Sequence, residues 1–326
     1  MIITRTPLRI SLGGGGTDLP SYYRKAGSGF LIAAAITKYV FITVNRNFDN
    51  DLILKYSQVE RIPEAADAKH PLLREALLLT GIDRGIEVTS MADIPTGTGL
   101  GSSGSFTVGV LRALRAANRE VVDNAELARQ ACTIEIERLG EPVGKQDQYI
   151  AAIGGVTAFN FNGDESVDVM PLDIADTTRD LLDDNLLLFY TGVRRSASEV
   201  LAEEQQQPEG SRSLAANLDL VKQLGFETKN ALETNELDRF GELLTEQWDL
   251  KYHRQRNVTH DMVDGWIQAG IAAGARGGKL VGAGGGGFLL FYAEEKARLR
   301  TAMANFGLEE VRFGIDYHGS TTLFAG

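Results

Sequence analysis

The stretch that decides the fold is Asp93-Ile94-Pro95-Thr96-Gly97-Thr98-Gly99-Leu100-Gly101-Ser102-Ser103-Gly104-Ser105. The apolar run before it predicts a strand over residues 85–92, and apolar residues at helical spacing after it predict a helix over residues 106–118. A loop with four glycines and three serines that opens into a helix offers backbone N–H groups and the positive end of a helix dipole to an anion. We therefore predict a phosphate-binding loop, because a simple turn needs only one or two glycines.

Two familiar classes of phosphate loop fit this stretch poorly. A Walker A loop would continue with Gly-Lys-Ser/Thr, whereas Gly101 is followed by Ser102. Residues 99–104 do satisfy G-x-G-x-x-G, which leaves an NAD(P)-dependent oxidoreductase open as an alternative. A dinucleotide-binding unit should also carry an acidic residue at the end of a second strand about 20 residues later. The region around Asp123 instead runs into a second helical pattern, so the fingerprint is incomplete.

Length and composition predict the class of protein. The 326 residues favour two domains, which we place at residues 1–180 and 181–326. The net charge is 33 − 44 = −11, which argues against a nucleic-acid partner. The single cysteine, Cys132, excludes an internal disulfide and fits a reducing compartment. The most apolar run, residues 30–44, is too short to span a membrane and contains Lys38, and no leader pattern is evident. We expect a cytoplasmic protein.

The periodicity of the remaining sequence predicts an α+β protein. In the first half we expect strands over residues 1–12, 32–44, 52–56, 155–161 and 166–172, and helices over 71–79 and 124–139. Pro7 should mark a break or an edge position in the first strand. In the second half we expect strands over 186–190 and 288–292 and helices over 214–232, 237–251, 259–273 and 294–305. Strands split around helices in this way suggest a ferredoxin-like second domain.

Two further glycine runs lie far from the first in sequence. Gly13-Gly14-Gly15-Gly16 precedes Thr17-Asp18, and Gly284-Gly285-Gly286-Gly287 precedes the expected strand at 288–292. Between them, Gly144-Lys145-Gln146-Asp147-Gln148-Tyr149 places an isolated acid at a loop-to-helix junction. Ordering so much bare backbone is costly unless a highly charged ligand receives its N–H groups.

Together these stretches resemble the three motifs of the GHMP kinases, the superfamily of galactokinase, homoserine kinase, mevalonate kinase and phosphomevalonate kinase. The first motif is matched by residues 7–18, the second by 95–105 and the third by Lys279-Leu280-Val281-Gly282-Ala283 with the glycines that follow. The resemblance implies a two-domain fold, with an N-terminal domain like domain 2 of ribosomal protein S5, a ferredoxin-like C-terminal domain, and the active site in the cleft between them. It also implies ATP-dependent phosphoryl transfer, which depends mainly on positioning and charge stabilisation.

The resemblance assigns roles to residues at matching positions. It implies Asp147 as the catalytic base, with Arg9 beside it to hold it ionised and to stabilise charge on the transferring group. Ser103 and Glu135 would bind Mg²⁺, a cation that prefers oxygen ligands. Glu137 is the rival of Glu135 for that role. The residues expected to bind ATP are Pro95, Gly97, Gly99, Leu100, Gly101, Ser102, Ser103, Gly104 and Ser105.

The acceptor is the least determined part of the resemblance. Galactokinases and mevalonate kinases carry Gly-Glu-His in the first loop, where this chain has Gly14-Gly15-Gly16-Thr17-Asp18. That form looks most like the D-glycero-D-manno-heptose 7-phosphate kinases, which phosphorylate the anomeric hydroxyl to give a 1,7-bisphosphate for nucleotide-activated heptose synthesis. A sugar phosphate needs cations, and Lys145, Arg194 and Arg195 stand in or near matching motifs. The residues expected to bind substrate are Gly14, Gly15, Gly16, Thr17, Asp18, Lys145, Gln146, Arg194, Arg195, Gly284, Gly285 and Gly286.

Three alternatives to this acceptor and activity stay open. Fucokinase-like enzymes share much of the first loop, so the acceptor could be an unphosphorylated hexose. The oxidoreductase remains the alternative from another enzyme class. A catalytically silent sugar sensor on the same fold is the third, because a fold does not guarantee activity. The expected partner is a small sugar phosphate, and a homodimer is left open.

Overall fold

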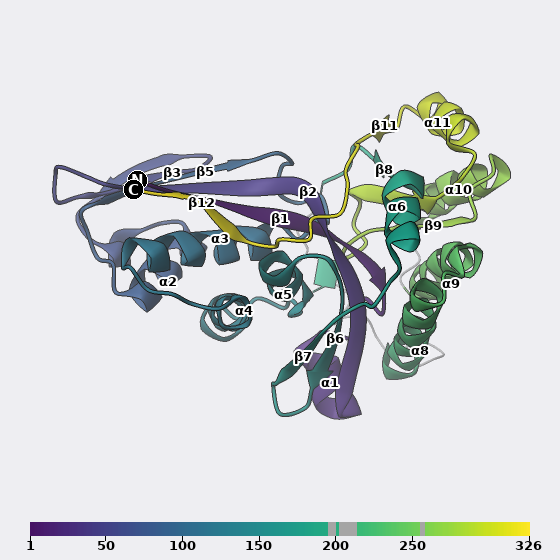
Figure 1. Cartoon of the computed structure of the whole chain (residues 1–326), viewed down its shortest axis with the longest axis horizontal. Helices are drawn as coiled ribbons and strands as arrows, with labels where there is room; N and C mark the ends of the chain where they lie inside the picture. Colours follow the sequence, from purple (N-terminus) through teal and green to yellow (C-terminus); the bar gives the residue numbers. More distant parts are fainter. Residues whose placement is uncertain (195–199, 202–213, 255–257) are drawn as a thin grey trace.

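The structure, a computed structural model, describes residues 1–194, 200–201, 214–254 and 258–326. It has two halves, each built on its own β-sheet (Figure 1). The predicted α+β class is confirmed. Within the described ranges, none of the helices combines the length and apolar character needed to cross a bilayer.

The first half is an eight-stranded sheet in the order β12-β1-β2-β5-β3-β4, with β6 paired to β2 and β7 to β6. All of these pairs are antiparallel except β3 with β5. The strands are β1 (Ile2–Gly13), β2 (Ser28–Arg46), β3 (Leu52–Lys55), β4 (Val59–Ile62), β5 (Ile86–Ala92), β6 (Val156–Asn162), β7 (Val167–Pro171) and β12 (Thr321–Ala325). Pro7 lies in a central strand, at a shift of register between β1 and β2, so the bulge accommodates its missing N–H.

Helices cover one face of this sheet, with α3 at its centre (Figure 1). They are α2 (Pro71–Thr80), α3 (Ser102–Ala117), α4 (Asn124–Cys132), a π-helical turn (Thr133–Arg138) and α5 (Gln146–Ile153). A short α1 (Pro20–Ala26) follows the first glycine run, and a 3₁₀ turn spans Ala65–Asp67. Two predictions need adjustment here. The helix expected from residue 106 begins at Ser102, so the serines belong to its first turn, and the helix expected over 124–139 changes to π-type winding after Cys132.

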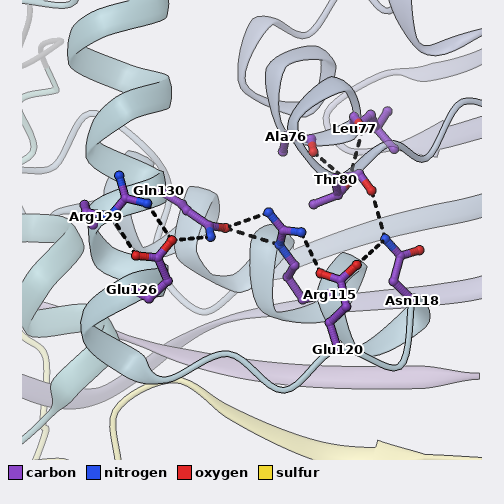
Figure 2. Close-up of polar contacts among 9 residues, drawn as sticks. All are labelled: Ala76, Leu77, Thr80, Arg115, Asn118, Glu120, Glu126, Arg129 and Gln130. Atoms are coloured by element: carbon purple, nitrogen blue, oxygen red, sulfur yellow. Dashed lines mark hydrogen bonds and ion pairs between the residues drawn. The ribbon is translucent and has the colours of Figure 1, made fainter.

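A polar network ties α4 to α3 and to the end of α2 (Figure 2). The Gln130 side-chain oxygen on α4 accepts hydrogen bonds from Arg115 on α3, at 3.2 Å from Nε and 3.1 Å from a terminal nitrogen. The Asn118 amide, just beyond α3, donates to the Thr80 carbonyl oxygen at 2.8 Å. Because α4 leads directly into the Thr133–Arg138 turn, the network helps to fix that turn relative to α3.

The second half is a four-stranded antiparallel sheet in the order β11-β8-β10-β9. Its strands are β8 (Leu186–Tyr190), β9 (Gly277–Leu280), β10 (Phe288–Tyr292) and β11 (Glu309–Glu310). Its helices are α8 (Leu214–Glu233), α9 (Leu237–Arg254), α10 (Val258–Ala272) and α11 (Lys296–Asn305), and α6 (Asp176–Asn185) leads into it. Renumbered within this half, the strand order is 4-1-3-2, which confirms the predicted ferredoxin-like arrangement.

Alternation along β8 and β10 divides the buried side chains between two cores. Leu187 and Phe291 belong to a core beneath α10 and α11, whereas Leu188 and Leu290 join the large core of the first half. The large core is therefore continuous across the junction of the two halves. The predicted division at residue 180 falls inside α6 and stays a prediction. The last strand, β12, pairs with β1 and so belongs to the first sheet.

Candidate active site

One pocket lies at the junction and draws its walls from both halves. Its empty volume, including its open mouth, is about 1140 Å³. The polar and charged side chains that line it are Arg9, Ser11, Asp18, Ser21, Gln146, Asp147, Gln247, Lys251 and Lys279. Apolar side chains of α8 and Leu201 form another part of the wall. A large concave pocket with a few convergent polar groups is the usual form of a small-molecule site.

At its base, Arg9 and Asp147 form an ion pair. Arg9, on β1, donates from Nε to Asp147 Oδ1 at 2.7 Å and from a terminal nitrogen to the Gly99 carbonyl oxygen at 2.5 Å. The Arg9 side chain is 6% exposed and that of Asp147, in the first turn of α5, is 21% exposed. Arg9 is therefore held in a fixed position, while the Asp147 carboxylate remains accessible from the pocket. A carboxylate held in this way can accept a proton from a bound hydroxyl.

The start of α3 packs directly on this pair. A Cβ added at Gly101 would lie 3.0 Å from Arg9 Cγ, and one added at Gly104 would lie 2.7 Å from Asp147 Cβ. Side chains at these two positions would push the ion pair out of place. The glycines therefore bring the helix N-terminus against the acid, as well as freeing the backbone.

The second glycine loop leaves donors available for an anion. Gly97, Gly99 and Gly101 have φ of 76°, 81° and 75°, a region that favours glycine. Gly101 is the N-cap of α3 and makes no side-chain capping bond, so the first N–H groups of the helix are uncapped. The Ser102 hydroxyl is buried without a hydrogen-bond partner among the described residues. Both features fit the phosphates of ATP.

Three other predicted ATP-binding residues make contacts that shape the loop itself. The Ser105 hydroxyl donates to the Pro7 carbonyl oxygen at 2.7 Å. The Pro95 carbonyl oxygen accepts from Thr98 at 3.0 Å. Leu100 is fully buried in the core.

Glu135 and Ser103 come together behind the loop. Burial raises the pKa of Glu135 to about 7, and hydrogen bonds from the side chains of Gln148, Ser103 and Thr107 oppose this shift. Glu137, the rival, is exposed and lies on another side of the turn. A buried carboxylate beside a serine hydroxyl fits the oxygen ligands that Mg²⁺ prefers. Within the described ranges, no cluster of three or more His, Cys, Asp or Glu side chains could hold a metal ion.

Asp18 forms the second acidic centre of the pocket. Burial, with the Asp147 charge, raises the pKa of Asp18 to about 6. Its carboxylate accepts backbone N–H bonds from Gly16 and Gln146, each at 3.2 Å. It lies so close to Gly144 that a Cβ there would be 1.8 Å from Asp18 Oδ2. Asp18 lines the pocket together with Gly15 and Gln146. All three were predicted to bind substrate.

Other predicted substrate residues face elsewhere. Gly14 packs on β2, where a Cβ would lie 2.1 Å from the Phe30 carbonyl oxygen, and the Thr17 hydroxyl lies 2.7 Å from that same oxygen. The Gly284 carbonyl oxygen contacts His260 Nε2 at 2.8 Å. Gly284, Gly285 and Gly286 do not line the pocket, although Gly282 and Ala283, just before them in the same turn, do.

The third glycine run joins the two halves. A Cβ at Gly282 would lie 2.6 Å from Gly99 Cα, and one at Gly287 would lie 2.0 Å from the Thr98 carbonyl oxygen. Bare backbone there lets the two loops touch. This contact accounts for Gly282 and Gly287 without requiring either of them to bind substrate.

The cations predicted to bind a sugar phosphate are not those in the pocket. The Lys145 ammonium pairs with the Glu165 carboxylate at 2.7 Å and also lies over the Tyr23 ring. Arg194 is exposed and donates to the Tyr190 hydroxyl at 3.0 Å. The geometry therefore does not support a phosphate-binding role for either residue. Arg195 lies outside the described residues.

The pocket instead contains Lys251 and Lys279, which the sequence prediction did not select as site residues. Lys279 opens the third motif, so its position in the sequence was a signal that could have identified it. Lys251 and its neighbour Gln247 lie one turn apart on α9, in a stretch without a motif. Only the fold brings that helix to the pocket.

The topology also decides against the dinucleotide alternative. A dinucleotide-binding unit needs a strand, a helix and a second strand parallel to the first. Here α3 is followed by another helix, α4, and not by a strand. The long strand β2, which pairs with β5, runs antiparallel to β5. The G-x-G-x-x-G match at residues 99–104 therefore belongs to a different kind of loop.

Comparisons with known proteins agree with this geometry. Residues 68–155 match the GHMP kinases N terminal domain, and residues 228–308 match the GHMP kinases C terminal domain. The chain is 29% identical over 305 residues to D-glycero-alpha-D-manno-heptose 7-phosphate kinase of Campylobacter jejuni, covering 90% of this chain and 89% of that protein. It is 25% identical to the bifunctional fucokinase/GDP-fucose pyrophosphorylase of Arabidopsis thaliana, over 90% of this chain but only 30% of the relative.

A solved structure shares the whole fold. The structure of a D-glycero-D-manno-heptose 1-phosphate kinase from Bacteroides thetaiotaomicron superimposes with a TM-score of 0.82 at 23% identity, covering 100% of both chains. Fold, pocket and relatives define a phosphotransferase that acts on a sugar hydroxyl, a sugar kinase. The chain belongs to the GHMP kinases, which use ATP as phosphoryl donor.

Proposed function

We propose that this sugar kinase transfers the γ-phosphoryl group of ATP to the anomeric hydroxyl of D-glycero-D-manno-heptose 7-phosphate and so forms the 1,7-bisphosphate. The observation that carries the reaction type is the Arg9–Asp147 pair, which lines the pocket and lies against the N-terminus of α3. The acceptor is supported by the 29% identical relative from Campylobacter jejuni, which acts on a heptose 7-phosphate.

In this proposal Asp147 takes the proton of the acceptor hydroxyl as its oxygen attacks the γ-phosphorus. Arg9 holds Asp147 through a 2.7 Å hydrogen bond, so the carboxylate does not have to be positioned during the reaction. The loop N–H groups and the Ser102 hydroxyl receive phosphate oxygens. Ser103 and Glu135 would hold Mg²⁺, which neutralises phosphate charge when bound.

Asp18 and Gln146 would bind the sugar. The Asp18 carboxylate is anchored by two backbone N–H groups, and the Gln146 side-chain oxygen is buried without a partner among the described residues. Both present acceptors to sugar hydroxyls on one side of Asp147. Assembly into a homodimer stays a prediction.

The test is transfer from Mg²⁺-ATP to a panel of sugars, sugar 6-phosphates and heptose 7-phosphate, with products identified by mass and ³¹P NMR. We expect a heptose 1,7-bisphosphate. Asp147→Asn should lower turnover by on the order of 10²- to 10⁴-fold while the calorimetric Kd for ATP changes little. Asp219→Asn is the matched control, because that carboxylate bonds the Tyr22 hydroxyl outside the pocket. Asp147→Asn at wild-type turnover would refute the base assignment.

A hexose 1-kinase activity is the second candidate. The similarity to a bifunctional fucokinase, over 90% of this chain, favours it. Phosphorylation of free L-fucose or mannose in the same panel, without transfer to heptose 7-phosphate, would keep the mechanism and replace the acceptor. Tight ATP binding without transfer to any sugar would instead favour the silent sensor.

A further inference from the structure

The turn between β6 and β7 contacts the segment that carries Asp147. Glu165 lies in this turn, and its carboxylate accepts three hydrogen bonds, from the Tyr23 hydroxyl at 2.7 Å, Arg24 Nε at 2.6 Å and the Lys145 ammonium at 2.7 Å. Tyr23 and Arg24 belong to α1, whereas Lys145 immediately precedes α5. One carboxylate therefore joins the β6–β7 turn to two segments that are far from it in the sequence.

The backbone and the charge of Glu165 indicate that these contacts hold it in one conformation. Its φ is 74°, in a region that favours glycine, and another residue stays there only where its surroundings fix it. Partial burial would raise its pKa, but hydrogen bonds from Arg24, Lys145 and Tyr23 lower the pKa of Glu165 to about 2. The carboxylate is therefore ionised at neutral pH, and two cations balance its charge.

Lys145 is the buried partner of this carboxylate. Only 8% of the residue is exposed. Its ammonium donates to the carbonyl oxygen of Glu165 at 2.9 Å as well as to the carboxylate, and it lies 5.1 Å from the centroid of the Tyr23 ring. Because burying an ammonium is costly unless it is paired and hydrogen-bonded, these contacts give the Lys145 side chain a defined position.

The backbone around Lys145 contacts one acidic centre of the pocket and carries the other. Gly144 lies against the Asp18 carboxylate, and the Gln146 N–H donates to that carboxylate at 3.2 Å. The Lys145 N–H donates to the Asp18 carbonyl oxygen at 3.4 Å. Asp147 follows two residues later, in the first turn of α5. A shift of residues 144–147 would therefore displace Asp147 and one of the N–H groups that hold Asp18.

We propose that Lys145 is a positioning residue: held by Glu165, it fixes residues 144–147 and so places Asp18 and Asp147 for the acceptor. This deepens the proposed function, and it rests on that function only in assigning these two carboxylates to the acceptor. The lysine then acts through the backbone of its neighbours and not through a contact with a substrate phosphate. Its effect should be the same for phosphorylated and unphosphorylated acceptors.

The test is a double-mutant cycle of Lys145→Met and Glu165→Gln, with steady-state kinetics for each acceptor that the enzyme phosphorylates. Glu165→Gln keeps the size of the side chain but replaces one acceptor oxygen with a donor. Because a small displacement of a catalytic group can cost about 100-fold, each single variant should lower kcat/KM for the acceptor about 10- to 100-fold, with KM for ATP changed by less than about twofold. Independent losses would multiply, whereas the double variant should lie within about threefold of the less active single variant.

The control separates positioning from a purely structural role. Glu310→Gln breaks a comparable ion pair outside the pocket, in which Arg300 of α11 donates to the Glu310 carboxylate of β11 at 2.7 and 2.8 Å. This variant should lower Tm without changing kcat or KM well below Tm. If Lys145→Met and Glu165→Gln do only the same, the proposal is refuted.

The other outcomes distinguish this proposal from the proposed function. A rise in KM for phosphorylated acceptors alone in Lys145→Met, with wild-type kinetics in Glu165→Gln, would make Lys145 a phosphate ligand and overturn the proposal. If Asp147→Asn keeps wild-type turnover while the cycle is non-additive as expected, the base assignment falls and the positioning role of Lys145 is supported. Should Lys145→Met fail to fold, Glu165→Gln decides alone, because it replaces a side chain that is 43% exposed.

Discussion

Adding one methyl group at Gly144 tests the geometry around Asp18 most directly. In Gly144→Ala the new Cβ would lie 1.8 Å from Asp18 Oδ2 and 2.4 Å from its Cγ. Real Cβ atoms do not approach other atoms so closely, so the Asp18 carboxylate or the loop at Gly144 must move. Moving the carboxylate breaks its 3.2 Å bonds to the N–H groups of Gly16 and Gln146.

The magnitude follows from the cost of overpacking. Forcing an extra carbon into a packed site costs about 1–3 kcal/mol. If the free enzyme relieves the strain by moving the Asp18 carboxylate, and acceptor binding has to restore its position, KM for the acceptor should rise about 5- to 150-fold, since each 1.4 kcal/mol is a factor of ten. KM for ATP should stay within about twofold, because the second glycine loop is built from other residues.

The assay is steady-state kinetics with each substrate varied in turn, together with thermal unfolding. Gly265→Ala is the control, because no described atom outside its own helix lies within 4 Å of the added Cβ. In α10 that change should leave kinetics unaltered and stabilise slightly, through the helix propensity of alanine. A Gly144→Ala enzyme with wild-type KM for the acceptor and wild-type Tm would refute the close approach of Asp18 to Gly144.

Two further predictions concern buried carboxylates. Because the pKa of Asp18 is raised to about 6 in the folded state, from 3.8, the folded protein binds more protons than the unfolded chain between these values. Its free energy of unfolding should therefore fall as pH rises from about 4 to 6, by roughly 3 kcal/mol. Asp18→Asn should remove this dependence in denaturant titrations, and an unchanged pH profile would contradict the assignment. Glu135→Gln should raise the Mg²⁺ concentration needed for half-maximal turnover at least tenfold, whereas the exposed control Glu137→Gln should not change it; equal effects would exclude Glu135 as a ligand.

The sequence predicted the elements well where pattern and local chemistry agree. The four glycines of residues 93–105 and the helix after them predicted a loop that leads into a helix N-terminus, and the structure has that arrangement, with positive φ at Gly97, Gly99 and Gly101. The ferredoxin-like second half followed from the order of strands and helices. The change from an α-helix to a π-helix was harder to predict. The sequence of Thr133–Arg138 continues the helical pattern of α4, but the structure has a π-helical turn there, and this turn buries Glu135.

The charged groups of the pocket were predicted less well, because the surroundings of a cationic side chain depend on which parts of the fold lie next to it. Lys145 is close to Asp147 in the sequence, but its ammonium bonds the Glu165 carboxylate and does not line the pocket. Lys251 is more than a hundred residues from Asp147 and yet shares its pocket. The third motif shows the same limit of local patterns. Gly282 lies against Gly99 and Gly287 lies against Thr98, and no local pattern reveals these contacts.

The pairing of β12 with β1 has a consequence for how the protein is made. Ile2 lies opposite Ala325, so β1 has a neighbour that is synthesised only after the entire second half. Until then β1 carries an unpaired flank, which chaperones or other nascent chains can contact. Arg9 lies on that same strand and Asp147 is also translated before β12, so the Arg9–Asp147 ion pair can form while the first sheet is still incomplete. We expect the first sheet to stay incomplete during synthesis until β12 has been made. A chain stalled before residue 321 should be bound by chaperones, although most of its pocket has been translated.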